Sequence, residues 1–101
     1  MRTAARVDAN QSEIVKSLRS IPNCKVAITS QLGDGFPDIV VGWQGANYLM
    51  EIKDGNKPPS KRKLTPAEKK FHDQWAGQID VVECIEDCWA VMGIANESTP
   101  F

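Results

Sequence analysis

Two acidic side chains and one lysine stand at a spacing that could hold a divalent cation. Asp38 follows Pro37 at the start of a β-branched run, and Glu51 and Lys53 lie two residues apart in a second run. Side chains two apart on a strand share a face, so pairing the two runs as a hairpin brings Asp38, Glu51 and Lys53 to one edge of a sheet. Carboxylate oxygens a few ångströms apart favour Mg²⁺, which keeps several waters and completes its shell with substrate phosphate. The spacing alone also fits a surface ion pair between Glu51 and Lys53.

A basic segment follows this cluster. Residues 53–70 carry seven Lys or Arg against two acids, whereas residues 71–101 carry six acids and neither Lys nor Arg. Such a loop suits the approach of a phosphate backbone, and charge alone also fits a solvated lysine-rich loop. The candidates for contacts to DNA phosphates are Lys57, Lys61, Arg62, Lys63 and Lys69.

Hydrophobic periodicity predicts an α/β fold with the order α-β-β-β-α-β-α, in which helices flank a mixed sheet of about four strands. The capping-box pattern of Thr65 and Glu68, with Pro66 at the first helical position, predicts the start of the second helix, with Leu64, Phe71 and Trp75 facing inward. The expected helices cover residues 8–21, 66 to 75 or 76, and a short segment to 92 capped by Glu86 or Asp87; the expected strands cover 25–29, 38–41, 48–53 and 79–85.

Length and composition limit the class of protein. With 101 residues, of which 42% are hydrophobic and 25% charged, we expect a single globular domain over residues 1–101 with a disordered tail from about residue 96. The apolar runs are far shorter than the ~20 residues of a membrane span, so we expect a cytoplasmic protein with no membrane partner. The three cysteines, Cys24, Cys84 and Cys88, form neither a disulfide framework nor a zinc motif, so we expect buried thiols.

The motif Pro37-Asp38, followed by Glu51-Ile52-Lys53, resembles the signature of the PD-(D/E)XK nuclease superfamily. The helix start at Leu64-Thr65-Pro66-Ala67-Glu68 after a basic loop is similar to that of the stand-alone VRR-NUC nucleases of phages and of archaeal-type Holliday junction resolvases. Together these features cover about residues 8–92. The Val-Arg-Arg element of VRR-NUC proteins is replaced by Val81-Val82-Glu83, and Glu68 stands where many relatives have glutamine.

The resemblance implies a restriction-endonuclease-like core and a metal site formed by Asp38, Glu51, the Ile52 backbone carbonyl and an acidic residue on the first helix, which we assign to Glu13. Glu13 also fits a capping box with Asn10. Lys53 as a general base would need a lowered pKa, and the two carboxylates oppose that shift, so we expect a charged Lys53 that positions the attacking water.

The expected function is therefore Mg²⁺-dependent hydrolysis of DNA, with Mn²⁺ as a substitute and no organic cofactor. By the resemblance we expect a homodimer that resolves branched DNA, in particular a four-way junction, inside a bacterial or phage-infected cell. The alternatives are a flap or duplex-nicking nuclease, a nuclease acting on RNA, and a non-catalytic DNA-binding module with the same fold.

Overall fold

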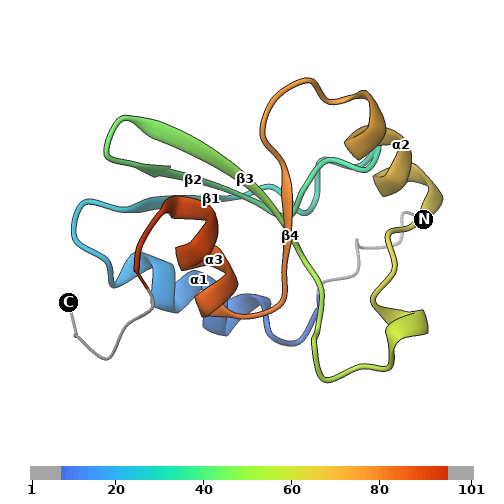
Figure 1. Ribbon diagram of the computed structural model, residues 1–101, viewed down its shortest axis with the longest axis horizontal. Coiled ribbons are helices and arrows are strands. Elements are labelled where there is room, and N and C mark those ends of the chain that lie inside the picture. Colours follow the sequence, from blue (N-terminus) through green and yellow to red (C-terminus); the bar gives the residue numbers. More distant parts are fainter. Residues whose placement is uncertain (1–7, 96–101) are drawn as a thin grey trace.

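A four-stranded mixed sheet forms the centre of the fold in the computed structural model, which describes residues 8–95 (Figure 1). The strands lie in the order β1-β2-β3-β4; the first three are antiparallel and β4 runs parallel to β3. The elements are α1 (Gln11–Arg19), β1 (Lys25–Ile28), β2 (Ile39–Trp43), β3 (Ala46–Ile52), the 3₁₀ turn η1 (Pro59–Lys61), α2 (Pro66–Gln74), β4 (Asp80–Val82) and α3 (Ile85–Met92). The α/β class, the mixed sheet and the predicted order of helices and strands are confirmed.

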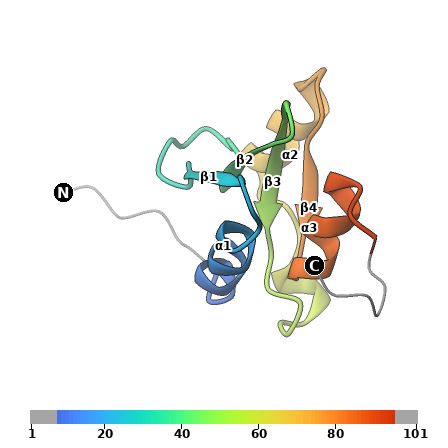
Figure 2. The same ribbon diagram turned by 90° about the vertical axis from the view of Figure 1, so that its left-hand side faces the viewer.

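One face of the sheet carries the hydrophobic core. Strand alternation sends Met50 and Ile52 of β3 to this face, where both are fully or almost fully buried. The apolar stripe of α1, with Leu18 at its centre, packs on the same face, and Cys88 of α3 joins it. Figure 1 shows α1 and α3 next to each other below the strands, and Figure 2 shows α2 above both helices.

A tight turn before β2 determines where α2 begins. Gly33, Asp34 and Gly35 all have positive φ angles, and a Cβ atom on Gly35 would overlap the Ala67 carbonyl. The turn can therefore pack directly on the first residues of α2, which sets that helix start beside Asp38. The predicted capping box is present, since Thr65 Oγ1 accepts a hydrogen bond from the Glu68 amide and Glu68 Oε1 accepts one from the Thr65 amide.

Several predicted element boundaries are wrong by two or three residues. α1 begins at Gln11 rather than at residue 8, β3 begins earlier, at Ala46, and β4 is shorter than residues 79–85. α3 begins at Ile85 after Cys84, not after Glu86 or Asp87. The Asp87 carboxylate instead accepts a hydrogen bond from the Glu83 amide at 2.8 Å, within the first turn of that helix.

Trp75 contradicts the predicted inward face of the second helix. Leu64 and Phe71 are partly buried, but Trp75 is 41% exposed. Its ring stacks on Phe71 with 5.1 Å between centroids, and its Nε1 donates to the Gln78 carbonyl. Trp75 follows the end of α2, and no residue of this helix belongs to the hydrophobic core, so the core does not cover the Trp75 ring.

Of the thiols, Cys88 is buried as predicted, Cys24 is half-buried and Cys84 is exposed, contrary to the prediction. Within residues 8–95, no helix is both long and apolar enough to cross a membrane. The tail predicted from about residue 96 lies outside the described residues.

Candidate functional site

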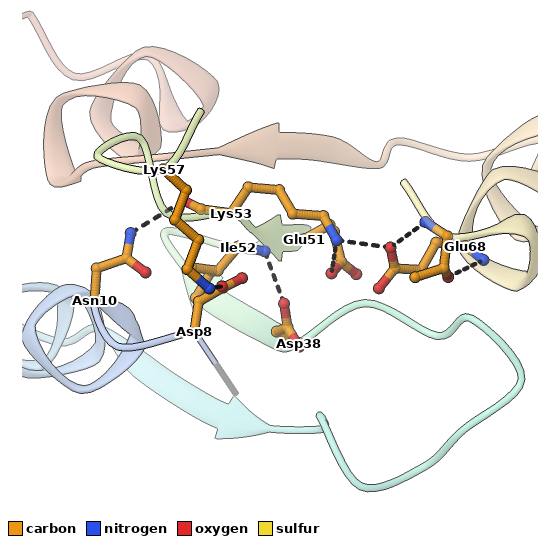
Figure 3. Close-up of polar contacts among 9 residues, drawn as sticks. Asp8, Asn10, Asp38, Glu51, Ile52, Lys53, Lys57 and Glu68 are labelled. Carbon is orange, nitrogen blue, oxygen red and sulfur yellow. Dashed lines mark hydrogen bonds and ion pairs between the residues drawn. The ribbon is translucent and has the colours of Figure 1, made fainter. Parts of the chain in front are cut away.

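The start of β2 and the end of β3 bring three of the four predicted catalytic side chains, Asp38, Glu51 and Lys53, into one cavity of about 390 Å³ (Figure 3). Ile39 pairs with Met50, so Asp38 stands opposite Glu51 at the point where β2 begins. Glu51 and Lys53 point to the face of β3 opposite the core. The convergence expected from the sequence is therefore observed for Asp38, Glu51 and Lys53.

The backbone N–H and C=O of Ile52 face the segment of Pro37 and Asp38 and form no regular strand pairing there. Continuing the register of β2 and β3 places Pro37 opposite Ile52, and proline has no N–H to donate to the Ile52 carbonyl. The Ile52 amide donates instead to Asp38 Oδ2 at 2.8 Å. In an antiparallel pair the N–H and C=O of one residue face the same neighbour, so the Ile52 carbonyl faces the Asp38 side, where the resemblance requires a ligand.

Glu51 is a buried acidic group of which only one oxygen lies near a cation. Its residue is 2% exposed, and Oε1 has no hydrogen-bond partner among the described residues. Burial, followed by the charge of Asp38, raises the pKa of Glu51 to about 10. Burial also raises the pKa of Asp38. Two adjacent buried carboxylates favour either a shared proton or a bound cation.

Lys53 is held between two carboxylates. Its Nζ lies 2.7 Å from Glu68 Oε1 and 3.7 Å from Glu51 Oε2. Burial lowers the pKa of Lys53, but the hydrogen bond and charge of Glu68, with further contributions from Glu51 and Asp8, outweigh burial and raise it. Lys53 is therefore a charged ammonium in this geometry, as the sequence analysis expected, rather than a neutral amine ready to accept a proton.

Asp8 and Asn10 occupy the positions near the site that we had expected Glu13 to reach. Asp8 lines the cavity, and Asn10 Nδ2 donates to the carbonyls of Lys53 and Glu83 at 3.0 and 2.9 Å. Glu13 is exposed and lines a different cavity, together with Asn10 and Glu83, so the structure does not bring it to Asp38. Asn10 also makes no side-chain cap, which contradicts the alternative capping box with Glu13.

The predicted DNA-contacting residues divide into two groups. Lys57 and Lys61 line the cavity, and Lys57 Nζ lies 2.9 Å from Asp8. Arg62 is paired with Glu83 at 3.3 Å and Lys69 with Asp73 at 3.2 Å, whereas Lys63 is exposed. Of these five residues, Lys57 and Lys61 are therefore the ones that line the cavity.

Sequence reasoning missed Asp8 and the contact of Glu68 with Lys53. Glu68 was visible as the fourth residue of a capping box, which places its carboxylate at the first turn of α2, but nothing local indicated that the turn would face Lys53. Asp8 carried no such signal, because its place depends on where α1 begins.

No group of three or more His, Cys, Asp and Glu side chains in residues 8–95 is arranged as a complete metal site. Four acidic residues line the cavity, namely Asp8, Asp38, Glu51 and Glu68, and the strand register places Asp38 opposite Glu51. Comparison with family models, curated proteins and solved structures found no match to this chain.

Proposed function

We propose that this chain is a Mg²⁺-dependent, structure-selective DNA endonuclease of the PD-(D/E)XK type. The observation that carries the proposal is the Glu51 carboxyl group, which is almost fully buried beside Asp38, has no hydrogen-bond partner at Oε1, and lies with Oε2 3.7 Å from the Lys53 ammonium. Such an arrangement costs stability in a protein without a ligand, and it becomes favourable when a cation and an anionic substrate enter the cavity.

The residues present fit a magnesium ion. Asp38, Glu51 and the Ile52 carbonyl offer hard oxygen donors at one edge of the sheet, and a cavity open to water supplies the remaining ligands that Mg²⁺ retains. Mg²⁺ or Mn²⁺ bound there would supply Lewis acidity toward a phosphoryl oxygen and toward the attacking water.

Lys53 would act on the substrate directly. Its ammonium is positioned to attract the scissile phosphate and to stabilise the charge that grows on the phosphoryl oxygens. In the hydrolysis, a bond forms between the water oxygen and phosphorus while the bond from phosphorus to the 3′ oxygen breaks, leaving a 5′-phosphate. The proton lost by the attacking water passes to solvent, and the leaving 3′ oxygen takes a proton from solvent.

The proposed substrate is branched DNA, with a four-way junction as the specific case. A domain this small offers little surface for reading base edges, which favours recognition of DNA shape. A single cavity of this kind cuts one strand, so resolving a junction calls for a homodimer. We place this activity in the cytoplasm of a bacterial or phage-infected cell.

A substrate panel tests the proposal. The chain is incubated with linear duplex, flap, splayed-arm and four-way DNA, and with single-stranded and duplex RNA, in Mg²⁺, Mn²⁺ or EDTA. Cleavage of junctions that requires metal supports the proposal, with light scattering expected to show a dimer. Cleavage of flaps or RNA would replace the junction as the assigned substrate. Binding without cleavage in any metal would identify a non-catalytic module.

A further inference from the structure

A single carboxylate oxygen of Glu68 joins the start of α2 to the catalytic lysine. Glu68 Oε1 accepts a hydrogen bond from the Thr65 amide at 2.8 Å and another from Lys53 Nζ at 2.7 Å (Figure 3). The first of these bonds belongs to the capping box, so the helix start fixes the direction of the carboxylate. The lysine therefore contacts an acceptor whose position is determined before any ligand binds.

The helix start is itself anchored to the segment that carries Asp38. Pro66 occupies the first helical position, and the Ala67 carbonyl lies where a side chain on residue 35 would stand. One turn later, the Phe71 ring meets Phe36 edge to face with 5.4 Å between centroids. Glu68 is thus fixed relative to the strand end that holds Asp38, although α2 stands apart from the core.

The two carboxylates around Lys53 are not equivalent. Glu51 lies 3.7 Å from Nζ, beyond hydrogen-bond distance, and under the proposed function its oxygens belong to the cation. Glu68 lies at 2.7 Å and does not share the end of β3 with the proposed ligands. A lysine side chain is flexible and forms point contacts, so a fixed partner is required to hold its ammonium in one place.

We propose that Glu68 is a positioning residue, which holds the Lys53 ammonium in the cavity at the place where the scissile phosphate binds. This inference rests on the proposed function. It adds a fourth functional side chain, contributed by α2, to the three supplied by the strand ends. It also assigns the capping box a second role, since the same oxygen that completes the helix cap restrains the lysine.

NMR of the lysine ammonium groups in ¹⁵N-labelled protein tests the contact without any catalysis. A restrained, buried ammonium exchanges its protons slowly with water and gives a visible signal, which Lys53→Arg identifies by removing it. We expect the signal to vanish in Glu68→Ala and to persist in Glu86→Gln, a change of an exposed first-turn carboxylate on another helix. An unchanged Lys53 signal in Glu68→Ala would overturn the inference.

Single-turnover cleavage then tests the role. Glu68→Ala should lower the rate of the chemical step about 10²-fold, with substrate affinity unchanged within about twofold, because misplacing a catalytic group affects the transition state more than binding. Glu68→Gln keeps an oxygen acceptor for Lys53 and should retain an intermediate rate. A loss of affinity with an unchanged rate would overturn the role.

Val26→Ala separates positioning from folding. It truncates a buried core side chain of β1 that does not line the cavity. We expect a lowered melting temperature and a rate near that of the unmodified chain; a rate loss as large as in Glu68→Ala would overturn the inference. If the unmodified chain cuts no substrate, the proposed function fails, and this role for Glu68 fails with it. If it cuts and Glu68→Ala cuts equally fast, the positioning role alone fails.

Discussion

The two faces of β3 are buried to nearly the same extent and filled with opposite chemistry. Met50 and Ile52 are 0% and 1% exposed on one face, and Glu51 and Lys53 are 2% and 8% exposed on the other. Apolar side chains from α1 and α3 cover the first face, whereas Asp38, Asp8 and Glu68 surround the second. Burial alone therefore does not distinguish the part of the strand that stabilises the fold from the part that we propose for catalysis.

Burial of a side chain changes the free energy of unfolding in opposite directions on the two faces. Burying Ile52 raises the free energy of unfolding through the hydrophobic effect, whereas burying Glu51, whose Oε1 has no hydrogen-bond partner, lowers it. Sites selected for activity commonly retain such unfavourable groups at a cost in stability. Changes on the two faces should therefore have opposite consequences for activity and for stability.

The largest expected effect is a loss of activity when charged side chains of the cavity are removed. Under the proposed function, Asp38→Ala or Lys53→Ala should lower Mg²⁺-dependent cleavage by about 10³-fold or more, since each removes a group that we propose acts on the transition state. DNA binding should remain within about twofold, because phosphate contacts from the basic loop persist. Single-turnover rates and fluorescence anisotropy measure the two quantities. Retained cutting by either variant would remove these residues from the site.

The next effect is on stability and comes from the apolar face. Ile52→Ala should lower the free energy of unfolding by about 2–5 kcal/mol, because it leaves a cavity in a fully packed region. Glu51→Gln, at the neighbouring position, should leave the free energy of unfolding unchanged or higher at neutral pH. Urea denaturation of both variants measures the difference, and an equal loss in both would contradict the contrast between the faces.

A smaller effect is expected from pH. The pKa of Glu51 is raised to about 10 in the folded chain, so the folded state keeps a proton that the unfolded state releases at lower pH. The free energy of unfolding should therefore fall as pH rises from about 4.5 toward about 10, by on the order of 1–3 kcal/mol between about pH 6 and pH 8.5. Glu51→Gln should remove much of this slope.

Added Mg²⁺ should counteract the loss of stability at high pH. A cation bound at Glu51, as we propose, would compete with the proton there, so added Mg²⁺ should raise the melting temperature more at about pH 8.5 than at about pH 6. Calcium, added as a non-catalytic control, should follow the same order. Stabilisation that is independent of pH would indicate that the cation binds elsewhere.

The smallest effect is expected in the basic loop. Lys61→Glu should weaken DNA binding about threefold to tenfold and reduce the salt dependence by about one phosphate contact, because Lys61 lines the cavity. Lys69→Glu should have less effect, since Lys69 lies on α2 paired with Asp73. Anisotropy titrations at several salt concentrations measure both. Equal effects of the two changes would show that the loop acts by net charge alone.

The features that sequence alone could predict are those set by local rules. Alternation along β3 placed Glu51 and Lys53 on one face, and the pattern Thr65-Pro66-Ala67-Glu68 located the start of α2. The start of α1 could not be predicted in the same way. Asn10 donates to the carbonyls of Lys53 and Glu83, more than forty positions away, and those contacts leave Asp8 outside the helix and beside the cavity.

The same distinction explains Trp75 and Glu68. Helical periodicity predicts which side chains share a face but not whether another element covers that face, and α2 extends beyond the sheet. The ion pair of Glu68 with Lys53 could not be predicted either. The capping box accounts for Glu68 and strand alternation accounts for Lys53, and neither pattern indicates that the two side chains meet.

Pro37 has a consequence for any attempt to redesign this domain. Alanine at this position would have an amide hydrogen that could be donated to the Ile52 carbonyl. The pairing of β2 and β3 would then extend by one residue pair. The longer hairpin would engage the Ile52 carbonyl, which we propose as a ligand of the cation, so a substitution chosen to make the sheet more regular would remove a proposed coordination position.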